Sequence, residues 1–539
     1  MRICNLCLIS ALFLISACEF TEPELLKENR VFPNASQNIS MTNLDADLIV
    51  TTTNDIFDLY WSGSEWVYPG GDGVLSLREA IFLSNELPGR QKIAFNIPTT
   101  DIGFNNGVFT IYPNGGWNHI EGDGLTIDGS TQTQFTGNTN PSGPEIVIDG
   151  SQMQPGTIFR IYSSYNHIHS LVINNLKCPG IMISGNGIKG NKITGCYIGT
   201  DPTGTIALPN NWIGIQITGQ NSSEHIIGGP NEFERNVISG NLNDGIQIHY
   251  GVTNCLIQGN YIGTDATGTK ALGNQGSGIS LITSLEQPTG EMKIYDNLIS
   301  GNGLDGINIT SQCLVKRNLI GTDKYGNAGL GNHGNGIRYS SSFNGEPSVG
   351  NIIGGSFKDG NIIKSNWLGI FLGENGSQNS EIVGNVISNN HVYGIGLENN
   401  VSFGNLFSQN MIFDNGDLGI DLKMDGITLN DQGDLDEGPN GLINFPIIEK
   451  INLTNGRLVI QGYVDFHSKE KLKIEFYSNN GSDLTGYGEG EIYLGSTTTN
   501  PHGKFTVTFP PIKSGLYVTA LAIDTNNNTS EFSKAYLVQ

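Results

Sequence analysis

Side chains that could do chemistry recur at one position of a repeated strand pattern. The pattern is Gly-Ile-x-apolar, and the alternation of a strand places its x residues outward. Arg338, with Asp244 and Asp305 at two strand entries, has the outline of a polysaccharide lyase, which needs a base and a group that neutralises the substrate carboxylate. The two aspartates lie two repeats apart, a separation that also suits the carboxylate pair of a glycoside hydrolase. A polysaccharide-degrading enzyme is therefore one interpretation of this face.

The same outward residues also suit binding of a hydroxyl-rich polymer without turnover. Amides and a histidine dominate the middle of the face, and a phenylalanine could stack on a sugar ring. The predicted ligand-binding residues are Gln216, Gln247, His249, Asn308, Arg338 and Phe371. The chain carries no familiar catalytic motif, so we expect binding of extracellular polysaccharide, or of a host or cell surface, in preference to catalysis. An ordinary solvated sheet face remains the alternative.

A dense acidic cluster precedes the last hundred residues. Its members are Asp431, Asp434, Asp436 and Glu437, four carboxylates within seven residues that include a glycine. Closely spaced carboxylates resemble a Ca²⁺ loop, although the spacing of an EF-hand is absent. The sequence predicts a Ca²⁺ site here and no other cofactor, and a solvated acidic linker is the alternative.

Composition limits the partners and the architecture. Lys and Arg number 28 against 51 Asp and Glu, which gives a net charge of -23 and argues against nucleic acid or an anionic membrane surface as a partner. Glycine is abundant, at 73 residues, and only 15% of residues are charged, so long charged helices are not expected. A chain of 539 residues is too long for a single ordinary core. We expect several domains or one elongated architecture.

The N-terminus has the pattern of a bacterial lipoprotein signal. Residues 1–17 contain a single Arg and a short apolar run, and Ile15-Ser16-Ala17 before Cys18 resembles a lipobox. Cys18 is the predicted lipidation site, residues 18–42 form a polar tether, and Glu19 favours the outer membrane. We therefore expect a lipoprotein at the outer membrane or cell surface of a Gram-negative bacterium, in contact with the membrane through its lipid anchor only. A plain secretory signal is the alternative.

An internal repeat predicts the fold of residues 121–442. Nine Gly-Ile pairs recur, and the last two intervals are 25 residues each, with no helical periodicity. Such short units cannot bury their apolar side alone and must stack on one another. Asparagine pairs five residues apart precede several strands, and stacked turns align such amides into ladders. The pattern is typical of a parallel β-helix; its isoleucines are Ile181, Ile215, Ile246, Ile279, Ile307, Ile337, Ile370, Ile395 and Ile420.

Different patterns flank the repeat. Residues 43–120 contain Ser76-Leu-Arg-Glu79, a capping box that predicts a helix over 76–86 and hence an N-terminal cap. Residues 443–539 lose the repeat and alternate apolar and polar positions with frequent turns. We expect a small antiparallel β-sandwich of Ig-like type there.

Several motifs carry a resemblance to a known family. They are S-L-R-E-A-I at 76–81, I-G-T-D-x-T-G-T at 198–205 and 262–269, D-L-G-I-D-L at 417–422, G-P-N-G-L-I-N-F-P at 438–446, Y-G-E-G-E at 487–491 and T-S-E-F-S at 529–533. The chain resembles bacterial secreted right-handed parallel β-helix repeat proteins of the pectin-lyase-like fold, whose N-terminal segment reads C-S-L-R-E-A-I. Leu75 stands here in the position of the cysteine. The resemblance implies an all-β right-handed β-helix followed by an Ig-like sandwich, and that fold hosts lyases, hydrolases and non-catalytic surface proteins alike.

Overall fold

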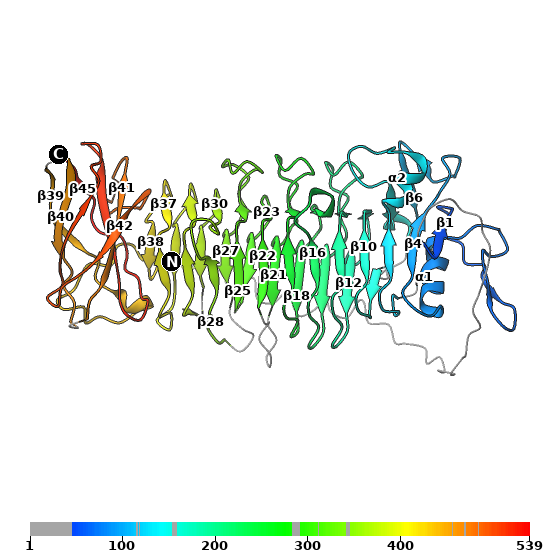
Figure 1. Cartoon of the computed structure of the whole chain (residues 1–539), viewed down its shortest axis with the longest axis horizontal. Helices are drawn as coiled ribbons and strands as arrows, with labels where there is room; N and C mark the ends of the chain where they lie inside the picture. The colour runs from blue at the N-terminus through cyan, green and yellow to red at the C-terminus, as the bar shows by residue number, and fades with distance from the viewer. Residues whose placement is uncertain are drawn as a thin grey trace, which may run out of the picture.

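The computed structural model describes an elongated, nearly all-β molecule (Figure 1). It describes residues 46–539 except 115, 116, 118, 154–158, 283–290, 311, 341–344, 374, 455, 468, 469, 483 and 484. The predicted signal segment 1–17, the lipidation site Cys18 and the tether 18–42 lie outside the described residues. Among the described helices, none is long and apolar enough to cross a membrane.

Three long sheets form the body of the molecule, and their strands stack in parallel apart from one antiparallel pair, β5 with β6. Sheet 1 contains β1 (Leu48–Val50), β4 (Lys92–Phe95), β7 (Thr126–Asp128), β10 (His167–His169), β13 (Lys192–Thr194), β16 (Ile226–Gly228), β19 (Leu256–Gln258), β22 (Met292–Tyr295), β25 (Cys313–Lys316), β29 (Ile352–Gly354), β33 (Glu381–Val383) and β36 (Leu406–Ser408). Sheet 2 contains β5 (Phe104–Asn105), β6 (Val108–Ile111), β8 (Ile146–Asp149), β11 (Leu171–Asn174), β14 (Tyr197–Ile198), β17 (Val237–Ile238), β20 (Tyr261–Ile262), β23 (Leu298–Ile299), β26 (Leu319–Ile320), β30 (Ile362–Lys364), β34 (Val386–Ser388) and β37 (Met411–Phe413). Sheet 3 contains β9 (Phe159–Ile161), β12 (Ile181–Ser184), β15 (Ile215–Thr218), β18 (Ile246–His249), β21 (Ile279–Ile282), β24 (Ile307–Ile309), β27 (Ile337–Tyr339), β31 (Ile370–Leu372), β35 (Ile395–Leu397) and β38 (Ile420–Leu422).

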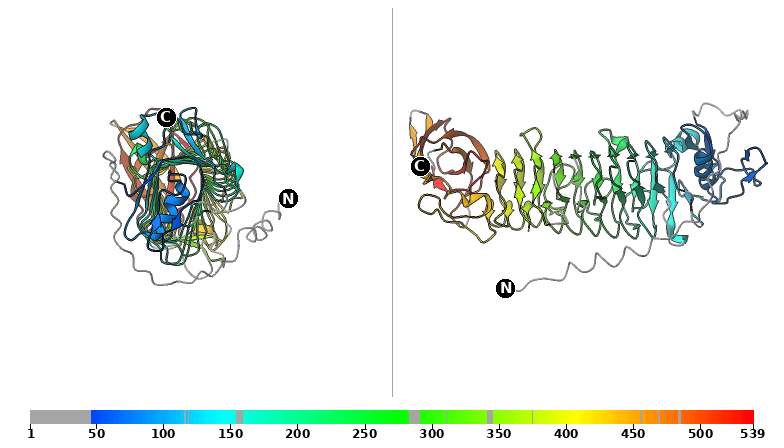
Figure 2. Two further views of the ribbon diagram at one scale, coloured as in Figure 1. Left: turned by 90° about the vertical axis from the view of Figure 1, so that its right-hand side faces the viewer. Right: turned by 90° about the horizontal axis from the view of Figure 1, so that it is seen from below.

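From β7 to β38 each coil contributes one strand to each sheet, so the chain winds around a common core, as the end-on view of Figure 2 shows. This arrangement is consistent with the predicted parallel β-helix. The short elements outside the three sheets are β2 (Tyr60–Trp61), β3 (Trp66–Val67), α2 (Thr131–Thr136), η2 (Gly150–Gln152), η3 (Glu232–Glu234), β28 (Ser348–Val349), β32 (Ser377–Gln378) and η4 (Pro439–Leu442).

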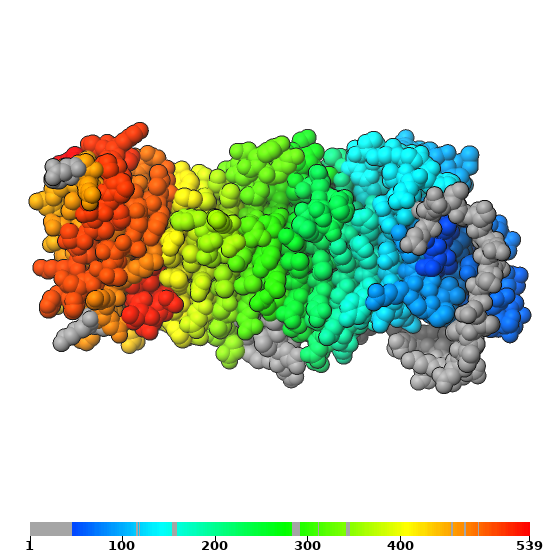
Figure 3. Space-filling view, in the orientation of Figure 1, coloured from blue at the N-terminus to red at the C-terminus, as the bar shows by residue number. Residues whose placement is uncertain are grey.

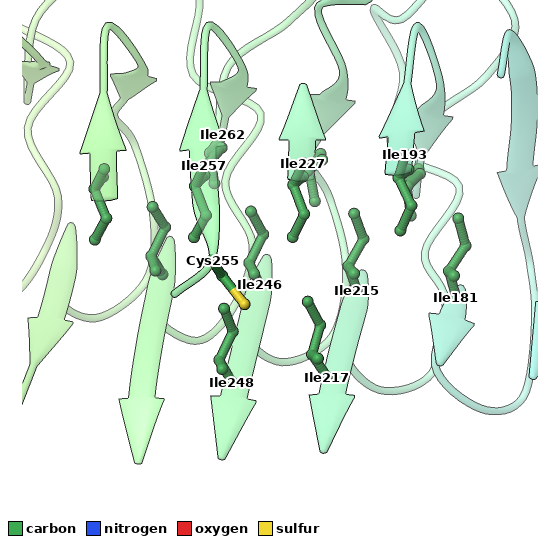
Figure 4. Close-up of a cluster of buried hydrophobic side chains, with 14 of the residues drawn as sticks. Ile181, Ile193, Ile215, Ile217, Ile227, Ile246, Ile248, Cys255, Ile257 and Ile262 are labelled. Carbon is green, nitrogen blue, oxygen red and sulfur yellow. The ribbon is translucent and has the colours of Figure 1, made fainter. Parts of the chain in front are cut away.

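Columns of isoleucine fill the core. Ile181 pairs with Ile215, and Ile215 with Ile246, so that identical side chains stack along the axis. Figure 4 shows these side chains meeting those of sheet 1, such as Ile227 and Ile257, in the interior. β-Branched side chains suit a strand, and full burial of each contributes roughly 1.5–3 kcal/mol. The repeated Gly-Ile pattern thus fixes both the strands and their register.

Asparagine ladders satisfy the turns between the sheets. Asn236 Nδ2 donates to Asn260 Oδ1 at 2.9 Å, and Asn260 Nδ2 donates to Asn297 Oδ1 at 3.0 Å. Each amide also donates to a backbone carbonyl, as Asn236 does to Ile193. The first ladder runs through Asn236, Asn260, Asn297, Asn318, Asn361, Asn385 and Asn410, and a second runs through Asn210, Asn241, Asn274, Asn302, Asn332, Asn366, Asn390 and Asn415.

The stacked sheets begin earlier than the boundary at residue 121 that the repeat predicts. Strand β1 pairs in parallel with β4, and β6 pairs in parallel with β8, so residues 43–120 are more than a cap. These strands lack the Gly-Ile pattern, which is why the repeat does not find them. Helix α1 (Leu77–Glu86) lies where the capping box places a helix, across the N-terminal end of the ring (Figure 2, left). The Ser76 side chain accepts the N–H of Glu79, whose carboxylate accepts the N–H of Ser76.

The last hundred residues form two antiparallel sheets around a second core. One sheet contains β39 (Ile447–Thr454), β40 (Arg457–Tyr463) and β43 (Lys504–Phe509), and the other contains β41 (Lys473–Asn479), β42 (Ile492–Thr498), β44 (Tyr517–Ile523) and β45 (Tyr536–Leu537). Between the two sheets, Phe476 packs edge-on against Phe505 and Phe509. We call residues 443–539 the sandwich; the Ig-like connectivity stays a prediction.

Candidate functional site

The outward residues of sheet 3 form one continuous column. Strand pairing aligns them one per coil, at the strand spacing of about 4.8 Å. In order along the axis they are Met182, Gln216, Gln247, Ser280, Asn308, Arg338, Phe371, Gly396 and Asp421. Arg160 extends the column at its N-terminal end, because it pairs with Met182. The sequence pattern does not find Arg160, because no Gly-Ile pair begins β9.

A hydrogen-bond network links two neighbouring residues of the column to His249. Gln216 Nε2 lies 3.2 Å from Gln247 Oε1 and 3.1 Å from His249 Nε2. Gln247 in turn donates its amide to Asp244 Oδ2 at 3.0 Å. Burial lowers the pKa of His249 to about 4, so the ring is neutral at pH 7. The centre of the face therefore offers neutral amide and imidazole groups.

Asp244 and Asp305 hold the backbone of the following coil. Asp244 Oδ1 accepts the N–H of Ser277 at 2.8 Å, and Asp305 Oδ1 accepts the N–H and the side-chain amide of Asn335, each at 2.8 Å. Both carboxylates are only 7% exposed. A Cβ on Gly276 would lie 2.4 Å from Asp244 Oδ1, so glycine permits this close approach. The two aspartates thus stabilise the entry to the strands.

The pKa values of Asp244 and Asp305 bear on whether these carboxyls could transfer protons. Burial raises the pKa of the Asp244 carboxyl and that of the Asp305 carboxyl, while hydrogen bonds to each oppose the shift. The charge of the Arg338 guanidinium also lowers the pKa of Asp305. A carboxyl with a raised pKa can transfer protons, and in both aspartates Oδ1 already accepts a backbone N–H.

Arg338 and Phe371 form the C-terminal part of the predicted ligand-binding residues. The guanidinium carbon of Arg338 lies 5.7 Å from the centroid of the Phe371 ring, within reach of a cation–π contact. Ser340 donates its hydroxyl to Asn308 Oδ1 beside them. All the predicted ligand-binding residues lie on sheet 3, and each is half-buried.

Three of the four predicted Ca²⁺ ligands converge. Asp431, Asp434 and Asp436 each bring one carboxylate oxygen within 4.8 Å of the others, whereas Glu437 is exposed and outside this group. The part of Glu437 as a fourth ligand stays a prediction. Burial raises the pKa of Asp434 to about 7, and the charges of Asp436 and Asp431 add to this shift. The hydrogen bond from the N–H of Asn444 acts in the opposite direction. Asp436 Oδ1 is buried without a hydrogen-bond partner. The arrangement offers hard oxygen ligands of the kind that Ca²⁺ takes.

Comparisons with known proteins give no identification. No protein-family model matches the chain. A solved chain described as Geobacillus virus E2 ORF18 is 12% identical, with 91% of this chain and 79% of that chain covered, at a TM-score of 0.27. A tailspike protein, gp49 from Acinetobacter baumannii bacteriophage Fri1, a capsular polysaccharide depolymerase, is 10% identical, with 86% and 79% covered, at a TM-score of 0.20. Such low scores carry no argument about this chain.

Proposed function

We propose that this protein binds extracellular polysaccharide along the outward face of sheet 3, as a lipid-anchored β-helix protein of the cell surface. One observation carries the proposal: the column is polar in every coil from Gln216 to Arg338, and hydrogen bonds join Gln216 to Gln247 and His249. Four strand spacings separate Gln216 from Arg338, or roughly 19 Å, which is room for several sugar units. Neutral donors and acceptors at regular intervals suit hydroxyl groups.

A panel of neutral and acidic polysaccharides tests the binding. Gln216→Ala with Gln247→Ala removes the centre of the network, and binding is measured by calorimetry. Gln258→Ala is the matched control, because Gln258 belongs to sheet 1 and bonds to Asp296. Retention of binding by the double variant, or equal loss in the control, would remove sheet 3 as the site. A surface scaffold or adhesin role would then replace polysaccharide binding.

A polysaccharide lyase or glycoside hydrolase is the second candidate. The specific observation in its favour is that burial raises the pKa of the Asp305 carboxyl, while the positive charge of Arg338 acts on the same group. Polysaccharides are incubated with the protein, and unsaturated products and new reducing ends are followed. Turnover that Arg338→Ala abolishes would establish the enzyme and displace the binding role.

Three further parts of the proposal stand on the sequence and on local geometry. The anchor is a lipid on Cys18, followed by the tether 18–42, at the outer membrane or surface of a Gram-negative bacterium. The acidic group of Asp431, Asp434 and Asp436 binds Ca²⁺. Family resemblance supports a right-handed β-helix and an Ig-like sandwich, and the net charge of -23 disfavours nucleic acid as a partner.

A further inference from the structure

The last coil of the β-helix carries groups that the next coil would satisfy if the stack continued. Within the stack, Asn415 Oδ1 accepts two bonds from Asn390, one from its N–H at 3.2 Å and one from its side-chain amide at 3.0 Å. Asn415 is the last residue of its ladder, and its own N–H and amide need equivalent acceptors. A bare sheet end with such unpaired groups is a template for pairing with another chain.

Glu489 of the sandwich takes the position of the next asparagine. Its Oε1 accepts both the N–H and the side-chain amide of Asn415, each at 3.1 Å, which repeats the pair of bonds one step earlier. Its Oε2 accepts the N–H of Asp414. Ile412 of β37 also exchanges two backbone hydrogen bonds with Gly490, at 2.9 and 2.7 Å. The second sheet therefore ends on the sandwich.

Two further glutamates serve the other sheets. Glu475 accepts the N–H of Gln409 at 2.9 Å and the hydroxyl of Ser408 at 2.6 Å at the end of sheet 1. Glu531 accepts the N–H of Leu422, the last residue of β38 in sheet 3, at 3.0 Å. Both glutamates are almost fully buried. One sandwich carboxylate thus meets the end of each sheet.

The apolar core also continues across this junction. Tyr477, Leu521, Ile523 and Phe532 of the sandwich belong to the core of the β-helix rather than to that of the sandwich. The Phe532 ring lies against Gly419 of the last coil, 3.2 Å from the position of a Cβ there. Figure 3 shows the orange and red sandwich in unbroken contact with the yellow coils on the face in view.

We propose that the sandwich is an end cap that replaces the next coil and blocks pairing of the last coil with a second copy of this chain. Its three glutamates occupy the hydrogen-bonding positions of a further coil, and its apolar residues close the core. The second copy is the occupant that fits these sheet ends best, since its strands carry the same spacing and ladder positions. This proposal is independent of the polysaccharide role.

Substitutions in the full chain test the cap. Glu489→Ala with Glu531→Ala should speed amide hydrogen exchange at Asn415 and Leu422 at least tenfold and produce concentration-dependent dimers by light scattering. Glu489→Gln keeps an acceptor oxygen and should protect Asn415 as the native residue does. Glu449→Ala, on an exposed position of β39, is the control. Native-like exchange in the double alanine variant, or a monomer at every concentration, would overturn the proposal.

A second measurement covers the case in which the double variant does not fold. A protease site inserted after the exposed Leu435 allows the chain to be cut in the folded protein between β38, the last strand of the β-helix, and β39, the first strand of the sandwich. The two parts should stay together during gel filtration, and their separation in mild denaturant should be followed by association of the β-helix part with itself. Parts that separate at once and remain monomeric would contradict the cap.

Discussion

Gln216 and His249 lie on successive strands, with Gln216 Nε2 3.1 Å from the ring Nε2. An amide nitrogen only donates, so His249 Nε2 must be the unprotonated acceptor and the ring proton must lie on Nδ1. The lowered pKa of His249 agrees with this tautomer. The structure therefore shows which group donates and which accepts: the Gln216 amide donates to His249.

We predict that His249 stays neutral down to about pH 5 in nuclear magnetic resonance titrations. The pKa of about 4 lies below the unfolded value, so the free energy of unfolding gains from the neutral ring above pH 6.5 and loses this contribution as the pH falls toward 4. Gln216→Glu should raise the pKa, because a carboxylate favours imidazolium. Gln258→Glu on sheet 1 should leave it unchanged. A wild-type midpoint near 6.5 would contradict the buried tautomer.

We predict that Gln216→Ala with Gln247→Ala weakens polysaccharide affinity at least tenfold, or about 1.4 kcal/mol. The variant removes two donors from the centre of the column, whereas the melting temperature should change little, because both side chains are only half-buried. Calorimetry with the bound polysaccharide measures the loss, and Gln258→Ala should bind as the native chain does.

Asp244→Ala should lower the free energy of unfolding by about 1–3 kcal/mol, because the N–H of Ser277 and the amide of Gln247 lose their acceptor. Asp244→Asn keeps one oxygen acceptor and should cost less. Chemical denaturation compares the two variants. An Asp244→Asn protein that loses a measurable turnover at unchanged stability would show a catalytic carboxyl instead.

We predict that millimolar Ca²⁺ raises the melting temperature, and more at pH 8 than at pH 5, because the ligands must be deprotonated. Asp434 has a folded pKa of about 7, above its ordinary value, so without the ion its contribution to stability is lost as the pH rises through 7. Asp434→Asn with Asp436→Asn should abolish the response. Glu437→Gln, outside the group, should keep it. A Ca²⁺ response intact in the double variant would refute this site.

Cys18→Ala should leave the precursor without lipid and move the protein from the membrane to the soluble fraction. Mass spectrometry of the N-terminus and membrane fractionation measure the two effects. The expected anchor is wrong if fractionation of the variant equals that of the native chain.

The sequence predicts which residues form the outward column, but it does not predict the hydrogen-bond partners of the residues around the column. A Gly-Ile pair in each coil from Ile181 to Ile420 sets the register, so the alignment of Gln216 with Gln247 follows from spacing alone. Asp244 also accepts the N–H of Ser277 from the turn of the next coil, and no local pattern indicates this partner. Glu489 and Asn415 are 74 residues apart, and only the folded chain brings them together. The sequence does not predict strand β4, because its residues follow no repeat.

Since successive coils stack through the same pairing of strands, one coil is a unit of length. Inserting or deleting one whole coil in the middle leaves both ends of the molecule unchanged and alters the outward column by one side chain, or about 4.8 Å. Related chains can therefore differ in length in whole steps. The length of the outward column is thus set by the number of coils, while the chemistry at each step is set by the residue that the coil contributes.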